Sequence, residues 1–152
     1  MREEILRRFF LGEVTGTELA KDIAGSEKRL DEIAIAVEIE DMAGELAVTR
    51  RMLMALCDAV LSGSLPPDAL GTIGFALMAS DKFSWNTDDD ELVSDAIADW
   101  SAPEISFPLT IENVKRFRTW LMGVEPYPNK PTRTATREGQ IISVREKRRI
   151  NA

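Results

Sequence analysis

Hydrophobic residues recur along most of this chain at spacings of three and four, which places side chains on one face of an α-helix. Residues that favour helix ends bound these stretches, such as Thr49 before one of them and Gly63 after it. We therefore expect a mainly α fold, with a single domain of about six helices. The pattern predicts these helices over residues 2–11, 15–25, 50–62, 66–78, 89–100 and 111–122.

Residues 33–48 depart from the helical spacing. Isoleucine and valine alternate there with alanine and glutamate, which is the period of a half-buried strand. A turn at 42–44 and a returning strand at 45–48 would complete one small β-hairpin near 33–48. A helix across the alanine-rich residues 30–48 is the alternative. The charged residues 26–32 predict a connection or a short helical turn.

A change of composition marks residues 124–152. Three closely spaced prolines followed by threonine- and arginine-rich sequence predict an extended C-terminal arm. Seven basic and three acidic residues give the arm a net charge of +4, so the total of −7 leaves −11 on residues 1–123. We therefore expect an acidic helical domain, 1–123, and a Pro-containing basic arm, 124–152. The apolar run at 141–144 could pair with a second subunit, which would give a homodimer, or with the hairpin of the same chain.

The residue types present exclude several kinds of chemistry. The chain has no histidine, the commonest general acid–base group and metal ligand, and its single cysteine cannot form an internal disulfide. Cys57 lies in an apolar helical stretch with no base beside it, so we expect a buried, inert thiol. Neither common glycine-rich phosphate-binding motif occurs. We expect a protein that is not an enzyme, with no catalytic residues, no cofactor and no metal site.

The apolar runs are too short for a membrane segment. None reaches the roughly 18 residues that a bilayer requires, and the N-terminus is amphipathic and carries acidic residues where a signal peptide carries basic ones. We therefore expect a cytoplasmic protein with no membrane partner.

Acidic and aromatic residues gather between Ser80 and Gly123, where all three tryptophans lie. This combination suits a surface that docks a basic protein, since the rings supply buried area and the carboxylates steer the partner. Trp100 and Trp120 fit the inner faces of their helices, whereas Trp85 falls between two helices. The residues that we expect to bind the partner are Trp85, Asp88, Asp89, Asp90, Glu91, Asp95 and Asp99.

Carboxylates at 88–91 have a second interpretation. Acidic residues at a helix start favour the helix dipole and commonly face water, so a solvated helix start is the alternative to partner contact. Their adjacent spacing differs from the alternating ligands and central glycine of a calcium loop.

The segment FFLGEVTGTELAKDI, residues 9–23, combines an aromatic helix end, a short break and a threonine-capped acidic helix. It resembles the start of the colicin D-type immunity proteins, over about 15 of the 152 residues. The resemblance implies a small, acidic, helical bacterial protein that plugs the basic active site of a tRNA-cutting toxin. Residues 56–65, 75–85 and 98–114 are similar to segments of bacterial proteins with no assigned activity.

Together, charge and resemblance predict a non-enzymatic protein-binding module. The expected function is that of a toxin-neutralising immunity-type inhibitor, which acts by occluding a basic cleft of its partner. The alternative is an oligomeric scaffold or adaptor that uses its C-terminal arm for subunit association. Nucleic acid is not an expected partner, because an acidic body repels phosphate.

Overall fold

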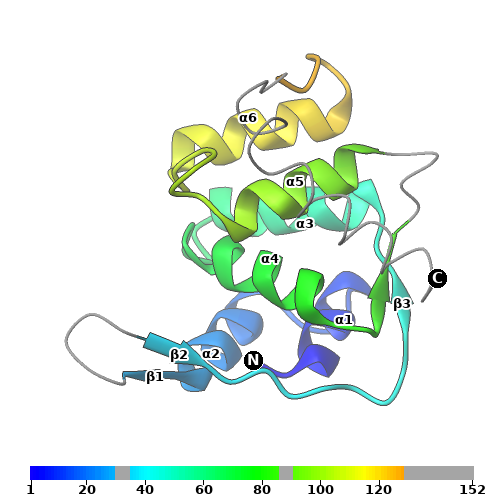
Figure 1. Ribbon diagram of the computed structural model, residues 1–152, viewed down its shortest axis with the longest axis vertical. Coiled ribbons are helices and arrows are strands. Elements are labelled where there is room, and N and C mark those ends of the chain that lie inside the picture. Colours follow the sequence, from blue (N-terminus) through cyan, green and yellow to red (C-terminus); the bar gives the residue numbers. More distant parts are fainter. Residues whose placement is uncertain (30–34, 86–90, 129–152) are drawn as a thin grey trace.

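The computed structural model of the protein describes residues 1–29, 35–85 and 91–128 (Figure 1). The fold of this part is mainly α, as the hydrophobic spacing predicts. Among the described helices, none is long and apolar enough to cross a bilayer. The described residues form six helices, namely α1 (Glu3–Phe10), α2 (Gly16–Ser26), α3 (Arg50–Leu61), α4 (Ala69–Ala79), α5 (Glu91–Ser101) and α6 (Ile111–Met122).

Two helix pairs make the centre of the domain. α4 packs along α5, and α3 packs along α6. α1 and α2 contact each other and lie at the end of the domain opposite α6 (Figure 1). Buried side chains from every helix form one core, in which Trp100 and Phe117 are among the largest that are fully buried. Their rings meet edge to face with centroids 5.9 Å apart, which joins α5 to α6.

Local capping chemistry fixes the ends of these helices. The side chain of Thr49 accepts a hydrogen bond from the N–H of Met52 at 3.3 Å, which caps α3. Thr110 caps α6 in the same way, through the N–H of Asn113 at 3.1 Å. Gly123 ends α6 with a φ of 78°, a left-handed conformation that glycine adopts without strain. The predicted boundaries at these three positions are confirmed.

The strands pair differently from the predicted hairpin. β1 (Glu27–Arg29) pairs antiparallel with β2 (Ile35–Val37), whereas β3 (Leu46–Ala47) pairs parallel with β4 (Phe83–Ser84). Strands at 35–37 and 46–47 thus fall where the alternation predicts them, and the helix alternative for 30–48 is wrong over these residues. The two strands do not pair with each other, however, because each finds its partner in another part of the chain.

Glu3 explains why the residues after β2 do not fold back on that strand. Its N–H donates to the carbonyl of Glu40 at 2.9 Å, and its carboxylate accepts the N–H of Met42 at 3.1 Å. These bonds hold residues 40–42 against the start of α1, and Met42 itself is buried. The chain therefore runs past α1 before β3 begins.

Candidate functional site

The acidic residues predicted to bind a partner do not all lie in the same kind of environment. Asp88, Asp89 and Asp90 lie outside the described residues. Glu91 is the first residue of α5 and is exposed, and Asp95, one turn later, is half-buried. Residues four apart share one face of a helix, so α5 presents these two carboxylates along one edge.

Trp85 is not the surface anchor that its place between two helices suggested. It is only 4% exposed and belongs to the hydrophobic core. Phe83 of β4 is also buried, whereas Ser84 between them is half-buried. Side chains two apart on an extended chain point to the same face, so the pairing of β4 with β3 turns Trp85 inward with Phe83. The expectation of an exposed indole is therefore wrong.

Asp99 is likewise unavailable to a partner, because it is fully buried. Its carboxylate accepts a hydrogen bond from the phenol of Tyr127, and its carbonyl accepts one from Ser106 at 2.8 Å. A buried carboxylate needs such donors, since desolvation otherwise disfavours its charge. Asp99 therefore has a structural role in the fold, which corrects its assignment to the binding surface.

Tyr127 also alters the expected domain boundary. Its ring lies 5.1 Å from that of Trp120 and 6.3 Å from that of Phe117, between centroids. Although residue 127 was assigned to the arm, its side chain packs on α6. The helical body therefore extends at least to Tyr127, and residues 129–152 of the arm lie outside the described residues.

The single thiol is buried as predicted. Burial raises the pKa of Cys57 to about 12, from its ordinary value of 9.0, and the neighbouring Asp58 carboxylate acts in the same direction. A thiol with this pKa holds almost no thiolate at neutral pH, so it is a poor nucleophile.

A polar hollow that no sequence pattern predicts lies where the N-terminus meets α2. Its volume is about 770 Å³. Three segments far apart in the chain surround it, namely the N-terminal residues, the C-terminal half of α2 and the residues after β2. Its lining consists of Met1, Arg2, Lys21, Asp22, Gly25, Ser26, Glu38, Ile39 and Glu40.

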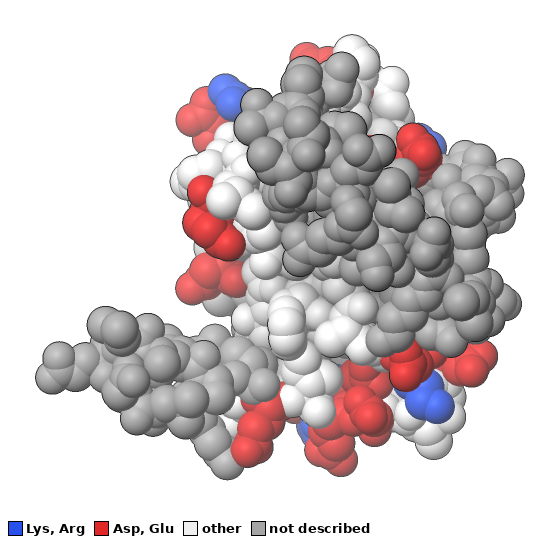
Figure 2. Space-filling model, viewed as in Figure 1, with Lys and Arg blue, Asp and Glu red and all other residues white. Residues whose placement is uncertain are grey.

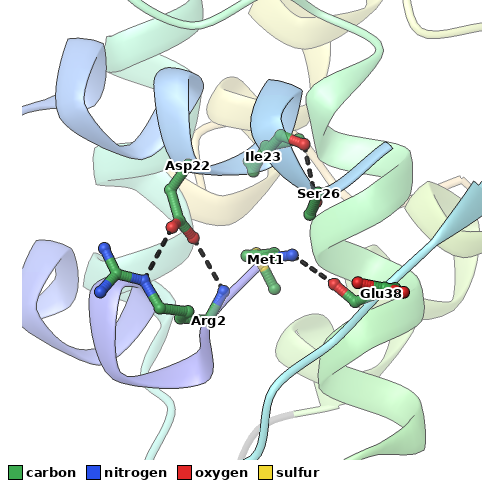
Figure 3. Close-up of polar contacts among 6 residues, drawn as sticks. All are labelled: Met1, Arg2, Asp22, Ile23, Ser26 and Glu38. Carbon is green, nitrogen blue, oxygen red and sulfur yellow. Dashed lines mark hydrogen bonds and ion pairs between the residues drawn. The ribbon is translucent and has the colours of Figure 1, made fainter. Parts of the chain in front are cut away.

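Backbone hydrogen bonds hold the walls of the hollow together. The N–H of Glu40 donates to the carbonyl of Met1 at 2.9 Å, and Arg2 and Glu40 form a parallel bridge. The N–H of Glu38 donates to the carbonyl of Ser26 at 3.1 Å, which ties the same segment to α2. The amino group of Met1 donates to the carbonyl of Glu38 (Figure 3). Burial lowers the pKa of this amino group, while Asp22 opposes the shift.

Asp22 fixes the orientation of Arg2 at the edge of the hollow (Figure 3). One carboxylate oxygen accepts the Nε–H of Arg2 at 2.9 Å, and the other accepts its backbone N–H at 2.8 Å. The side chain of Asp22 is only 13% exposed, whereas that of Arg2 is 57% exposed. The pair therefore holds the guanidinium group in place while leaving its outer part in water.

The described residues offer ionic and hydrogen-bonding chemistry rather than metal binding, since no three cysteine or carboxylate side chains among them converge on one point. No single motif could have revealed the hollow, because its charged residues come from three separate segments, at positions 2, 21–22 and 38–40. No family model, curated protein or solved structure matches this chain.

Proposed function

We propose that the protein is a non-enzymatic acidic module that binds a basic protein and occludes its cleft, as toxin-neutralising immunity-type proteins do. The partner would present clustered lysine and arginine side chains, as a nuclease does at the site where it binds phosphate. The carboxylates of this chain would take the place of those phosphates.

The observation that carries this proposal is the charge of the helical domain. Residues 1–123 carry a net charge of −11, while the whole chain carries −7. On the face drawn in Figure 2, acidic side chains are spread around the edge of the domain and few basic ones lie among them. A field of one sign over a small domain raises the rate at which an oppositely charged partner associates, and salt weakens this effect.

The proposed contact surface begins at the start of α5. Glu91 is exposed there, and it directly follows Asp88, Asp89 and Asp90 in the chain. Asp95 extends the acidic edge by one helical turn. Trp85 and Asp99 are buried and are not part of the proposed surface. The contact would thus depend on carboxylates, with no tryptophan at its centre.

The first test is affinity capture with the full chain from the native host, followed by calorimetric titration of the captured partner at two salt concentrations. The variant carries Asp88→Asn, Asp89→Asn, Asp90→Asn and Glu91→Gln. Each exposed ion pair contributes up to about 1 kcal/mol, so we expect binding weaker by about tenfold or more and a shallower dependence on salt.

A matched control removes the same number of charges elsewhere. Glu4, Glu13, Glu18 and Glu112 are all exposed, and their replacement by glutamine changes the net charge equally. We expect this control to slow association slightly and to leave the affinity within about threefold of the wild type. The proposed surface is rejected if both variants lose the same affinity, and the function is rejected if no basic protein is captured.

A further inference from the structure

The hollow beside the N-terminus is lined by charged groups of both signs. Arg2, Lys21 and the Met1 amino group supply cations, and Asp22, Glu38 and Glu40 supply anions. Figure 3 shows Arg2 on one side of Met1 and Glu38 on the other. Asp22 pairs with Arg2, Arg2 forms a backbone bridge with Glu40, and the Met1 amino group interacts with Asp22, Glu38 and Glu40. Groups of both signs therefore lie side by side along the hollow.

Among the described residues, Arg2, Lys21 and Glu40 keep charged atoms that bind no other side chain. Within the described ranges, the side-chain partner of Arg2 is Asp22, which binds its Nε, and no described residue bonds its two terminal nitrogens. Within the described part of the chain, neither the Lys21 ammonium group nor the Glu40 carboxylate has an ion-pair partner. Arg2, Lys21 and Glu40 are all exposed, so a ligand can reach them without unfolding any element.

The hollow also has room for a ligand. A Cβ added at Gly25 would meet no heavy atom of the described residues within 4 Å. Ile39 adds a half-buried apolar surface to the lining. The volume of about 770 Å³ lies within the range of roughly 300–1,000 Å³ that is typical of ligand sites.

We propose that this hollow binds a dipolar ligand, in which an anionic and a cationic group are separated by a short spacer. The anionic group contacts Arg2 and Lys21, and the cationic group contacts Glu38 and Glu40. Such chemistry can come from a free zwitterion or from a polypeptide segment with neighbouring acidic and basic side chains. The site uses none of residues 88–95, so it can be tested independently of the proposed function.

The test is a titration of the isotope-labelled full chain, monitored by NMR through the chemical shifts of its amide groups. The probes are 6-aminohexanoate, a free zwitterion, and a blocked Lys-Gly-Glu peptide, which carries both charges on side chains. Hexanoate and 6-aminohexanamide carry one charge each and serve as controls. We expect saturable shifts at residues 21–26 and 38–40 with a two-charge probe. The single-charge compounds should bind about fivefold more weakly, since each loses one exposed ionic contact.

Variants of the lining distinguish a specific site from general attraction of charge. Lys21→Glu and Glu40→Lys should each weaken binding by about fivefold, and the double variant should weaken it further because it places a repelling charge at each end of the ligand. Gly25→Leu should narrow the hollow and weaken binding, while Gly25→Ala should leave the affinity close to that of the wild type. Circular dichroism checks that each variant is folded.

Every outcome of this titration decides the proposal. Saturation with the peptide alone identifies a polypeptide ligand, and saturation with 6-aminohexanoate alone identifies a small molecule; either result supports the site. Absence of saturable shifts with both probes would overturn it. Equal affinity for the single-charge compounds, or unchanged binding by the folded Gly25→Leu variant, would also overturn it.

Discussion

The contact between α4 and α5 makes a sharp prediction about Gly74. A Cβ added there would lie 2.9 Å from the backbone nitrogen of Ser101, 3.0 Å from the Cβ of Trp100 and 3.1 Å from the carbonyl oxygen of Ile97. Two of these atoms are backbone and the third is the first atom of a fully buried side chain. None of them can move aside without shifting α5 away from α4.

Gly71, one turn earlier in α4, provides a matched control. A Cβ there would lie 3.4 Å from the Cδ1 atom of Leu109 and 3.6 Å from the carbonyl oxygen of Trp100, which are ordinary contact distances. Alanine is favoured over glycine within a helix by about 1 kcal/mol. Gly71→Ala should therefore raise the free energy of unfolding by up to about 1 kcal/mol.

Gly74→Ala gains the same helix propensity but pays for overpacking, which typically costs about 1–3 kcal/mol. Because its three contacts are short and rigid, we expect the upper part of that range and a net loss of about 2 kcal/mol. For a chain of 152 residues this lowers Tm by about 4–8 °C, whereas Gly71→Ala should raise Tm by about 2–4 °C.

Urea unfolding followed by circular dichroism at 222 nm measures both changes, and equal m-values would show that the unfolded states are comparable. The decisive result is the opposite sign of the two substitutions. If Gly74→Ala stabilised the protein as much as Gly71→Ala, the close approach of α4 to α5 would be refuted.

Three further predictions concern buried polar groups. Tyr127→Phe should lower the free energy of unfolding by about 1–3 kcal/mol, because Asp99 loses a donor while the ring packing is kept; unchanged stability in urea would contradict the hydrogen bond. Cys57 should not react with a thiol reagent in the native protein at pH 8. Since its native pKa of about 12 exceeds its ordinary value of 9.0, its contribution to stability is complete below about pH 9 and declines by about 1.4 kcal/mol per pH unit toward pH 12. Cys57→Ala should remove this part of the loss of stability at alkaline pH. Identical profiles of stability against pH for the variant and the wild type would refute the raised pKa of Cys57. Glu3→Ala should destabilise the protein by about 1–3 kcal/mol because the buried N–H of Met42 loses its acceptor, whereas Glu3→Gln should retain the bond and most of the stability in urea.

The sequence predicts those parts of the fold that depend on neighbouring residues. Hydrophobic spacing locates the helices, and Thr49, Thr110 and Gly123 mark ends that the structure confirms. Capping bonds join residues three apart, so the sequence contains everything that they require. A glycine in an apolar helix allows another helix to pack against its backbone, as α5 does at Gly74.

Contacts between residues far apart in the chain cannot be predicted from such local patterns. β3 pairs with β4 at Leu46 and Phe83, which are 37 positions apart. No local pattern in either strand indicates which other strand it pairs with. Asp99 has the spacing of a solvated helical acid, and only the return of Tyr127 across α5 and α6 shows that it is buried. The hollow likewise depends on segments that come together only after the whole domain has folded.

The burial of all three tryptophans changes the kind of binding energy that the proposed function can use. Trp85, Trp100 and Trp120 are 4%, 0% and 7% exposed, so none is available as the buried aromatic anchor that usually dominates a protein interface. The proposed contact would then rest on exposed carboxylates, whose interactions are screened as ionic strength rises. Affinity should therefore fall steeply between about 0.05 M and about 0.5 M salt, where the screening length drops from roughly 14 Å to roughly 4 Å. A complex that keeps its affinity over this range would have to be held by apolar contacts, for which Phe75 and Ile105 are the largest exposed side chains on α4 and on the loop before α6.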